Sequence, residues 1–185
     1  MKKVINKIAN FVEEQGFKRD DKGFVFNDGK VEWRLDIQAR KYRQLKQFFI
    51  DISVHPLVIP KAGTSFFWDR LEPSDDRNSW SNDLPEKELE ELKVEFENAM
   101  KNYFLPLSKI EDTIRTKPVE EMLPESEQDR TIYGFCYPVR CFDFANLALA
   151  YGDKAKSRQF AEWGLSKIEL KPAFKEPLEK LAGIA

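Results

Sequence analysis

The chain has 185 residues, and 42% of them are hydrophobic, which argues against disorder throughout because this apolar area offsets the chain entropy lost on folding. Thirty lysines and arginines stand against 32 aspartates and glutamates. The basic excess that nucleic-acid binders use against phosphates is missing, so nucleic acid is not expected as a partner. At this length we expect one domain, residues 1–185.

The first segment predicts an amphipathic helix that packs on a core. Val4, Ile8 and Val12 recur at intervals of four residues and share one stripe, and Gly16 stands where a helix normally ends. A membrane-surface helix is the alternative, but it would carry a more basic polar face. Charged residues from Lys2 onward interrupt any apolar run. We therefore expect no signal peptide and no membrane span, and cytoplasmic localisation follows by default.

Three runs with a period of two predict an antiparallel sheet with one buried face. These runs comprise residues 24–26, 31–37 and 48–54. Pro56 and Pro60 mark the end of the third run, because proline cannot donate to a strand ladder. Residues Thr64–Leu71 are expected to add a fourth strand.

Turn chemistry and burial together predict the register of this sheet. Asp28-Gly29 supplies the positive φ angles of a tight hairpin turn, which sets Phe26 opposite Val31. Aligning the apolar faces of the second and third strands sets Arg34 opposite Asp51, and this complementary pair supports the alignment. The stretch Ala39–Gln47 between those strands is expected to be a polar loop.

The second half of the chain predicts helices joined by loops. Residues 72–83 are expected to form a long loop anchored by Trp80. The expected helices cover residues 85–103, 108–115 and 139–151, a segment from about 153, and residues 173–181. Pro106 is expected to interrupt the first of them.

These elements predict the α+β class, with a three- or four-stranded antiparallel meander packed on one face by an N-terminal helix and C-terminal helices. Residues 1–82 would supply the first helix and the sheet, and residues 83–185 the mainly helical part. Composition marks a possible subdomain boundary near 118–131. We expect the two halves to share one core.

No motif in the chain predicts catalysis, a metal or a nucleotide cofactor. His55 is the only histidine, and it has no recognisable relay partner. Cys136 and Cys141 lack the second pair or the histidines of a structural zinc site, and a free cysteine is usually a small buried hydrophobe. The glycines are too dispersed for a phosphate-binding loop. We therefore expect no catalytic residues, no metal and no cofactor.

Two groups of residues are typical of partner binding. The first is a basic group around an aromatic in the loop after the second strand, formed by Arg40, Lys41, Tyr42 and Arg43. The second combines tryptophan and arginine, the commonest interface anchors, and consists of Trp68, Arg70, Arg77 and Trp80. A charged hairpin tip that discourages edge association is the alternative for the first group. Burial of both tryptophans against the sheet is the alternative for the second.

Several short strings are similar in kind and order to those of a known bacterial family. They are Gly16-Phe17-Lys18 with Phe24 and Phe26, Leu35-Asp36-Ile37-Gln38, Phe49-Ile50-Asp51-Ile52, Trp80, and Leu105-Pro106-Leu107 after an acidic helix. With a final alanine-rich helix pair, this pattern resembles the family catalogued as domain of unknown function 4304. The resemblance implies an α+β fold and a bacterial source, and it implies no activity, cofactor or catalytic residue.

Two main functions remain open from the residues alone, and a weaker third is nucleic-acid contact through the loop from Arg40 to Lys46. A well-patterned domain without a catalytic constellation favours a non-enzymatic binding or adaptor protein with a protein partner, including an immunity-like protein of a bacterial conflict system. The alternative is an enzyme with an unrecognised polar site between sheet and helices, where Asp69, Arg70, Arg140 and Asp143 would converge.

Overall fold

The computed structural model describes residues 2–42, 45–59, 66–75 and 77–184, with the backbone alone at residues 40–42 and 45–46. The chain divides into two compact units, the first formed by Met1–Leu57 with Lys61–Leu107 and the second by Val58–Pro60 with Ser108–Ala185. The segment 118–131, which composition marks as a boundary, lies inside the second unit. A core shared by both halves stays a prediction.

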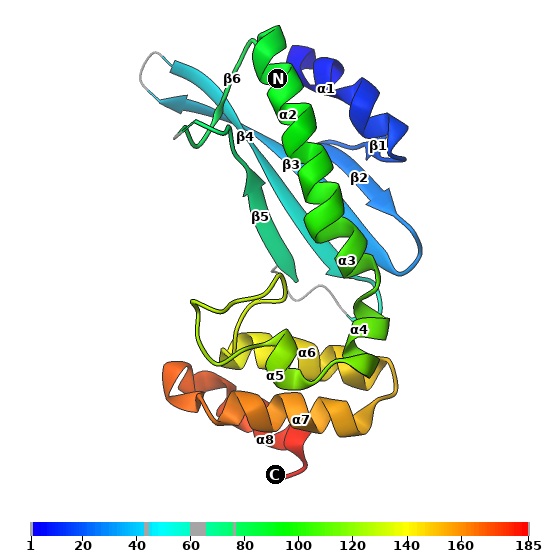
Figure 1. Cartoon of the computed structure of the whole chain (residues 1–185), viewed down its shortest axis with the longest axis vertical. Coiled ribbons are helices and arrows are strands. Elements are labelled where there is room, and N and C mark those ends of the chain that lie inside the picture. Colours follow the sequence, from blue (N-terminus) through cyan, green and yellow to red (C-terminus); the bar gives the residue numbers. More distant parts are fainter. Residues whose placement is uncertain (1, 43–44, 60–65, 76, 185) are drawn as a thin grey trace. The chain divides into compact units, whose positions relative to one another are not determined.

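The first unit is built on an antiparallel sheet, and the α+β class is confirmed (Figure 1). Its strands are β1 (Lys18–Arg19), β2 (Gly23–Asn27), β3 (Val31–Tyr42), β4 (Leu45–Pro56), β5 (Phe67–Leu71) and β6 (Trp80–Ser81). Strands β1 to β5 follow one another in space as they do in sequence, and β6 also pairs with β4. The predicted meander is therefore correct, with the fourth strand at β5 and two short strands added.

One face of the sheet carries the helices and the core of this unit. Helices α1 (Lys2–Glu14) and α2 (Glu86–Ala99) both pack there. Phe17, in the turn after α1, has its ring centroid 5.8 Å from that of Phe96 on α2. Trp33 of β3 stacks on Phe104 at 5.1 Å between centroids. This buried face is called the inner face below, and the opposite one the outer face.

Both predicted registers are wrong by two residues, whereas the predicted inner face is right. Phe26 lies opposite Trp33 rather than Val31. Arg34 lies opposite Ser53, and Asp36 takes the place opposite Asp51. The expected loop at Ala39–Gln47 is mostly strand, because β3 and β4 remain paired as far as residues 42 and 45.

Pro106 was expected to interrupt the long helix, but the chain stays helical through this residue. Residues Met100–Phe104 form a π-helical turn, η1, and helix α3 (Leu105–Ser108) continues from it. In this turn the backbone N–H of Leu105 donates to the carbonyl of Met100, five residues back. A π turn is one of the local adjustments that let a helix continue around a break in its normal hydrogen-bond ladder.

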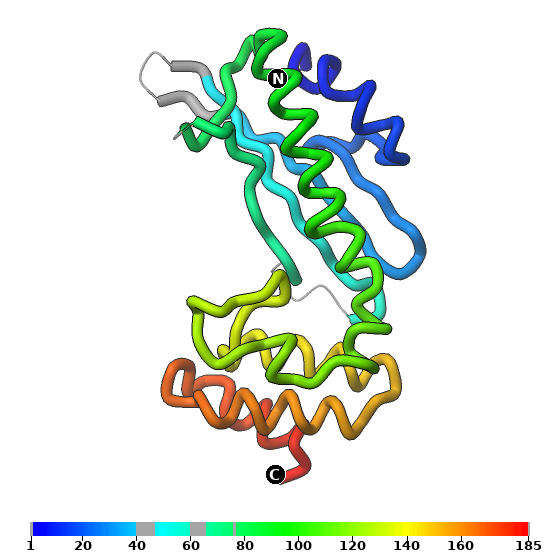
Figure 2. The backbone as a smooth tube through the Cα atoms, in the orientation of Figure 1, coloured from blue at the N-terminus to red at the C-terminus, as the bar shows by residue number. Residues whose placement is uncertain are grey.

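The second unit is helical, as predicted (Figure 2). Its helices are α4 (Ile110–Thr116), α5 (Val119–Met122), α6 (Pro138–Ala150), α7 (Lys154–Leu165) and α8 (Lys175–Ala182), with short 3₁₀ turns η2 (Ile168–Leu170) and η3 (Pro172–Phe174). Helix α7 begins as expected at Asp153, whose carboxylate accepts from the backbone N–H of Lys156 at 2.9 Å. A Cβ added to Gly164 of α7 would stand 2.7 Å from the Cβ of Cys141 on α6. Close contact between α6 and α7 therefore requires glycine there.

Across the described ranges, every helix is too short or too polar to cross a bilayer.

Candidate protein interface

An exposed tryptophan marks the outer face of the sheet. Trp68 lies on β5, the strand at one end of the sheet order, with Phe67 and Leu71 as buried neighbours on the other face. The Trp68 side chain is 55% exposed, and it is the only aromatic among the large exposed hydrophobic side chains of the described residues. Its cross-strand neighbour is Ser53, whose small side chain leaves room for the indole ring. Burial of this tryptophan, one of the alternatives from sequence, is wrong.

Arg70 lies over the indole ring of Trp68. Its guanidinium carbon lies 4.4 Å from the ring centroid of Phe49 and 5.6 Å from that of Trp68, so the cation contacts two aromatic rings. Its Nε also donates to Oδ1 of Asp51 at 2.7 Å. The hydrogen bond and the contact with Phe49 restrict the rotamers of Arg70.

Asp51 is the buried acceptor that orients this arginine. The Asp51 residue is only 5% exposed, and its second oxygen, Oδ2, accepts from Nε2 of Gln38 on β3 at 2.8 Å. A buried carboxylate is stable when both oxygens are paired in this way. A continuous row of contacts thus crosses three strands. We call Gln38, Phe49, Asp51, Trp68 and Arg70 together the Trp68 platform.

A second ionic cluster lies beside this platform and centres on Arg34. Its guanidinium pairs with Asp20, with Glu32 at 3.6 Å and with Asp36 at 3.5 Å. Burial raises the pKa of Asp20, but backbone hydrogen bonds from residues 22 and 23 and the charge of Arg34 outweigh this effect and lower the pKa overall. Asp36 faces Asp51 directly across the ladder. Because like charges opposite each other repel, the two arginines stabilise this arrangement.

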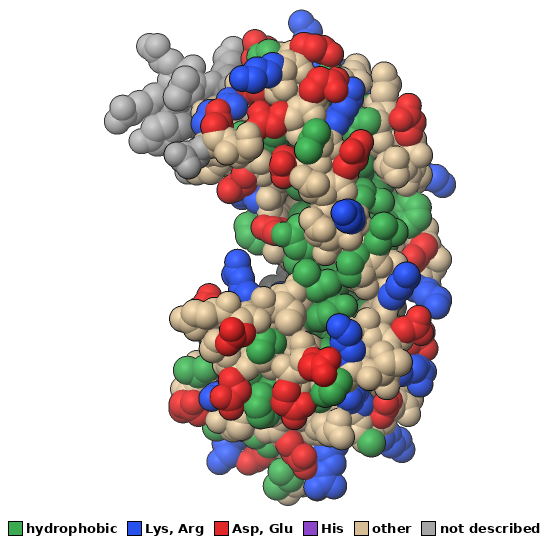
Figure 3. Space-filling view, viewed as in Figure 1, with side chains coloured by type: hydrophobic (Ala, Val, Ile, Leu, Met, Phe, Trp, Pro, Cys, Tyr) green, Lys and Arg blue, Asp and Glu red, His purple; other side chains and the backbone are tan. Residues whose placement is uncertain are grey.

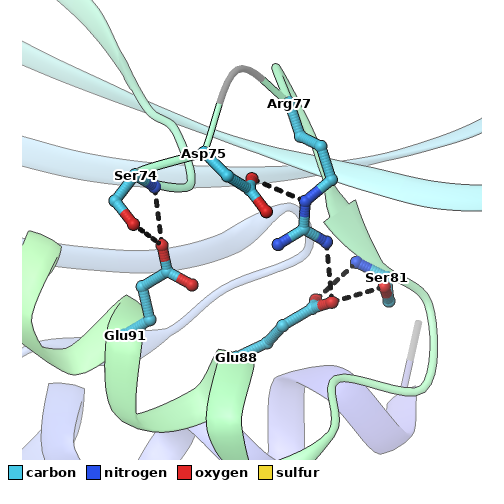
Figure 4. A network of polar contacts seen from close by, with 6 residues as sticks. All are labelled: Ser74, Asp75, Arg77, Ser81, Glu88 and Glu91. Carbon is cyan, nitrogen blue, oxygen red and sulfur yellow. Dashed lines mark hydrogen bonds and ion pairs between the residues drawn. The ribbon is translucent and has the colours of Figure 1, made fainter.

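Arg77 belongs to a different structure, which fastens the loop before α2 (Figure 4). Its guanidinium donates to Asp75 at 2.6 Å and to Glu88 of α2 at 2.8 Å. Glu88 also accepts from the backbone N–H of Ser81 at 2.9 Å and from its hydroxyl at 2.7 Å. One turn further along α2, Glu91 accepts from the backbone N–H and the hydroxyl of Ser74. This arginine is therefore engaged in holding the loop.

Trp80 is an internal anchor and takes no part in the surface. Its side chain is fully buried, and its Nε1 donates to the carbonyl of Leu71 at 2.8 Å. The prediction that Trp80 anchors the loop of residues 72–83 is therefore correct. Trp80 also forms part of β6. The predicted group of four thus separates into a surface pair, Trp68 with Arg70, and two loop anchors.

The basic group predicted for partner binding lies outside what the structure describes. The backbone of Arg40, Lys41 and Tyr42 belongs to β3, while their side chains and the whole of Arg43 fall outside the described residues. Binding through this group stays a prediction.

The four residues of the predicted enzymatic site belong to two units. Asp69 and Arg70 lie on β5 in the first unit. Arg140 and Asp143 lie one helical turn apart on α6 in the second unit, with NH1 of Arg140 3.9 Å from Oδ2 of Asp143. Their convergence stays a prediction.

Sequence reasoning missed Gln38, Phe49 and Asp51 as members of the platform, although it placed Asp51 in a cross-strand ion pair. All three positions have the alternation that places them on the outer face, so the signal was present. It becomes informative only once β3, β4 and β5 are known to lie side by side in this register.

No protein-family model, curated protein or solved structure matches the chain. The resemblance to the family of domain of unknown function 4304 stays a prediction.

Proposed function

We propose that the chain is a non-enzymatic protein-binding module, and that its interface is centred on the Trp68 platform. The observation that supports this proposal is the 55% exposed indole, which has the guanidinium of Arg70 over its ring. Leaving a large apolar ring in water is unfavourable. Covering Trp68 with a partner would bury that area.

The platform lowers the entropic cost of such binding. Association orders side chains at an interface and costs about 0.5–1.5 kcal/mol for each one immobilised. Arg70 is already held by Asp51 and Phe49, and Trp68 packs on Arg70. Tryptophan and arginine are also the residue types most enriched among binding hot spots. Burial of the indole can therefore contribute to affinity with little further ordering.

Binding by addition of a strand to β5 is less well supported. The strand has only five residues and carries two charged side chains. Its backbone N–H at Arg70 already donates to the carboxylate of Asp69 at 2.8 Å. Short, charged edges with occupied donors discourage strand pairing. The proposed interface therefore uses side chains of the outer face.

Replacing Trp68 tests the proposal directly. Affinity-tagged wild-type protein and Trp68→Ala would be recovered from cells that naturally produce the chain, and co-purifying proteins would be quantified by mass spectrometry. We expect a partner that is enriched with the wild type and reduced at least about tenfold with Trp68→Ala, as for a hot spot worth about 2 kcal/mol. The stability of the variant should change by no more than about 1 kcal/mol, because the side chain is exposed.

Val94→Ala is the matched control for this experiment. Val94 lies on α2 and is 54% exposed, so its truncation removes a comparably exposed apolar group away from the platform. We expect this variant to retain the partner. A wild-type protein that repeatedly enriches no partner, or a partner retained equally by all three proteins, would refute the proposal. The identity of the captured protein would then distinguish an adaptor from an immunity-like protein, whose partner is a toxin.

A further inference from the structure

The two cysteines of the second unit face each other inside its core. Cys136 lies in the segment just before α6, and Cys141 lies in the first turns of that helix. Their Sγ atoms are 4.0 Å apart, and both residues are at most 1% exposed. Both are free thiols. Since a disulfide has an S–S length of about 2.05 Å, the two sulfurs need to approach by roughly 2 Å.

We infer that Cys136 and Cys141 are a redox modification site that closes to an intramolecular disulfide under a peroxide oxidant. The geometry carries this inference, because the two thiols already point at one another and only four residues separate them. The segment before α6 is also free of regular helix or strand from residue 123 to 137, apart from one isolated bridge between Thr131 and Gly134. That segment can shift more easily than two packed helices could.

The two thiols have different surroundings, and these assign the order of the chemistry. The hydrogen bond with Cys141 lowers the pKa of the Cys136 thiol. The same contact and burial raise the pKa of Cys141. Because the thiolate is the nucleophile, Cys136 reacts first with hydrogen peroxide and breaks the O–O bond. This step forms a sulfenic acid on Cys136, and hydroxide leaves and takes up a proton to become water.

The second step closes the bond. The Cys141 sulfur, as it loses its proton, attacks the sulfenic sulfur of Cys136, and the hydroxyl group leaves as a second water. In total, two thiols and one peroxide give one disulfide and two waters. Burial makes the reaction slow until the segment before α6 opens, so the site responds to sustained oxidation rather than to a brief pulse.

Closing the disulfide also removes a contact to α7. The thiol of Cys136 donates to the carbonyl of Trp163 at 3.3 Å, and this donor is lost on oxidation. The hydroxyl of Ser166 donates to the same carbonyl at 2.7 Å, so that oxygen keeps one partner. The end of α7 therefore remains in place while the segment before α6 is tied to its own helix.

Intact-mass measurement on the full-length protein tests this inference. After incubation with hydrogen peroxide, we expect the mass of the monomer to fall by that of two hydrogen atoms. Neither thiol should then be alkylated. Treatment with dithiothreitol should restore the original mass and both alkylatable thiols. In Cys141→Ser, a dimedone adduct should form on Cys136. In Cys136→Ser, the remaining thiol should stay unmodified under the same conditions.

The wild-type protein alone decides the outcome if either serine variant fails to fold. Two thiols that remain alkylatable after peroxide has fully oxidised glutathione in the same tube would overturn the inference. Disulfide-linked dimers in place of an internal bond would overturn it as well. Peptide mapping that joins Cys136 to Cys141 in the monomer would support it.

Discussion

Two tryptophans of the first unit are buried to a similar degree but differ in their hydrogen bonding. Trp33 is 4% exposed and packs between Phe26 and Phe104, yet its Nε1 has no hydrogen-bond partner among the described residues. Trp80 is fully buried, and its Nε1 donates to the Leu71 carbonyl. A buried donor without a partner costs about 1–3 kcal/mol, whereas a satisfied one contributes to stability.

This difference predicts unequal effects of one substitution at the two sites. Both Trp33→Phe and Trp80→Phe lose ring volume, which destabilises a core. Only Trp80→Phe also removes a buried hydrogen bond, the one from Nε1 to the Leu71 carbonyl, so it should cost about 1–3 kcal/mol more than Trp33→Phe. Urea unfolding followed by circular dichroism measures both. Equal losses, or a larger loss at Trp33, would contradict the hydrogen-bond assignment.

At the scale of elements, Glu88 fastens the loop before α2 onto that helix. Its side chain is 12% exposed. Burial raises the pKa of Glu88, but hydrogen bonds from Arg77 and Ser81 outweigh burial and lower the pKa below its ordinary value. A carboxyl whose pKa is lowered on folding stabilises the protein above its unfolded pKa. That contribution is lost as the pH falls through the folded pKa.

Glu88→Gln should therefore destabilise the protein by about 1–2 kcal/mol near pH 7. The difference from the wild type should shrink as the pH falls below about 4 and through the lowered pKa of Glu88, since the glutamate then becomes neutral like the glutamine. Glu90→Gln is the control, because Glu90 is 59% exposed and, within the part of the chain that the structure describes, pairs only with Lys93. Urea unfolding near pH 7 and again below pH 4 measures the stability of the wild type and both variants. A loss at Glu88 that is independent of pH would contradict the ionic role.

Residue periodicity predicted the faces of these strands correctly, whereas the registers predicted from turn chemistry and burial were wrong by two residues. A shift of two residues keeps every side chain on the same face, so burial alone cannot detect it. The turn sets the register of the first hairpin. In this turn the Asp28 carboxylate accepts from the backbone N–H groups of Lys30 and Val31. Gly29 then takes the positive φ of +86°. Asp28 thus caps the turn from its first position instead of occupying one of its two central positions.

Only part of the candidate interface could be predicted from the sequence. Trp68 and Arg70 stand out by residue type alone. The predicted partner of Asp51 was Arg34 of β3, but Asp36 takes that place, and the ion pair forms with Arg70 of β5 on the other side of β4. The separation of Trp68 from Trp80 depends on which side chain the fold buries. Composition cannot supply that information.

In the whole molecule, the two proposed sites lie in different units. The Trp68 platform lies in the first unit, and the cysteine pair lies in the second. The view in Figure 3 shows acidic and basic side chains interspersed on both. With a formal net charge of -2, the chain offers little overall electrostatic attraction to a charged partner. Recognition is therefore expected to depend on a local platform rather than on net charge.

Site-specific photo-crosslinking tests that expectation most directly. Benzoylphenylalanine would replace Trp68 in one protein and Val94 in another, two positions of nearly equal exposure, and both would be irradiated in cells that naturally produce the chain. We expect a discrete crosslinked partner from position 68 and none from position 94. The absence of any product from position 68, or the same products from both positions, would contradict it.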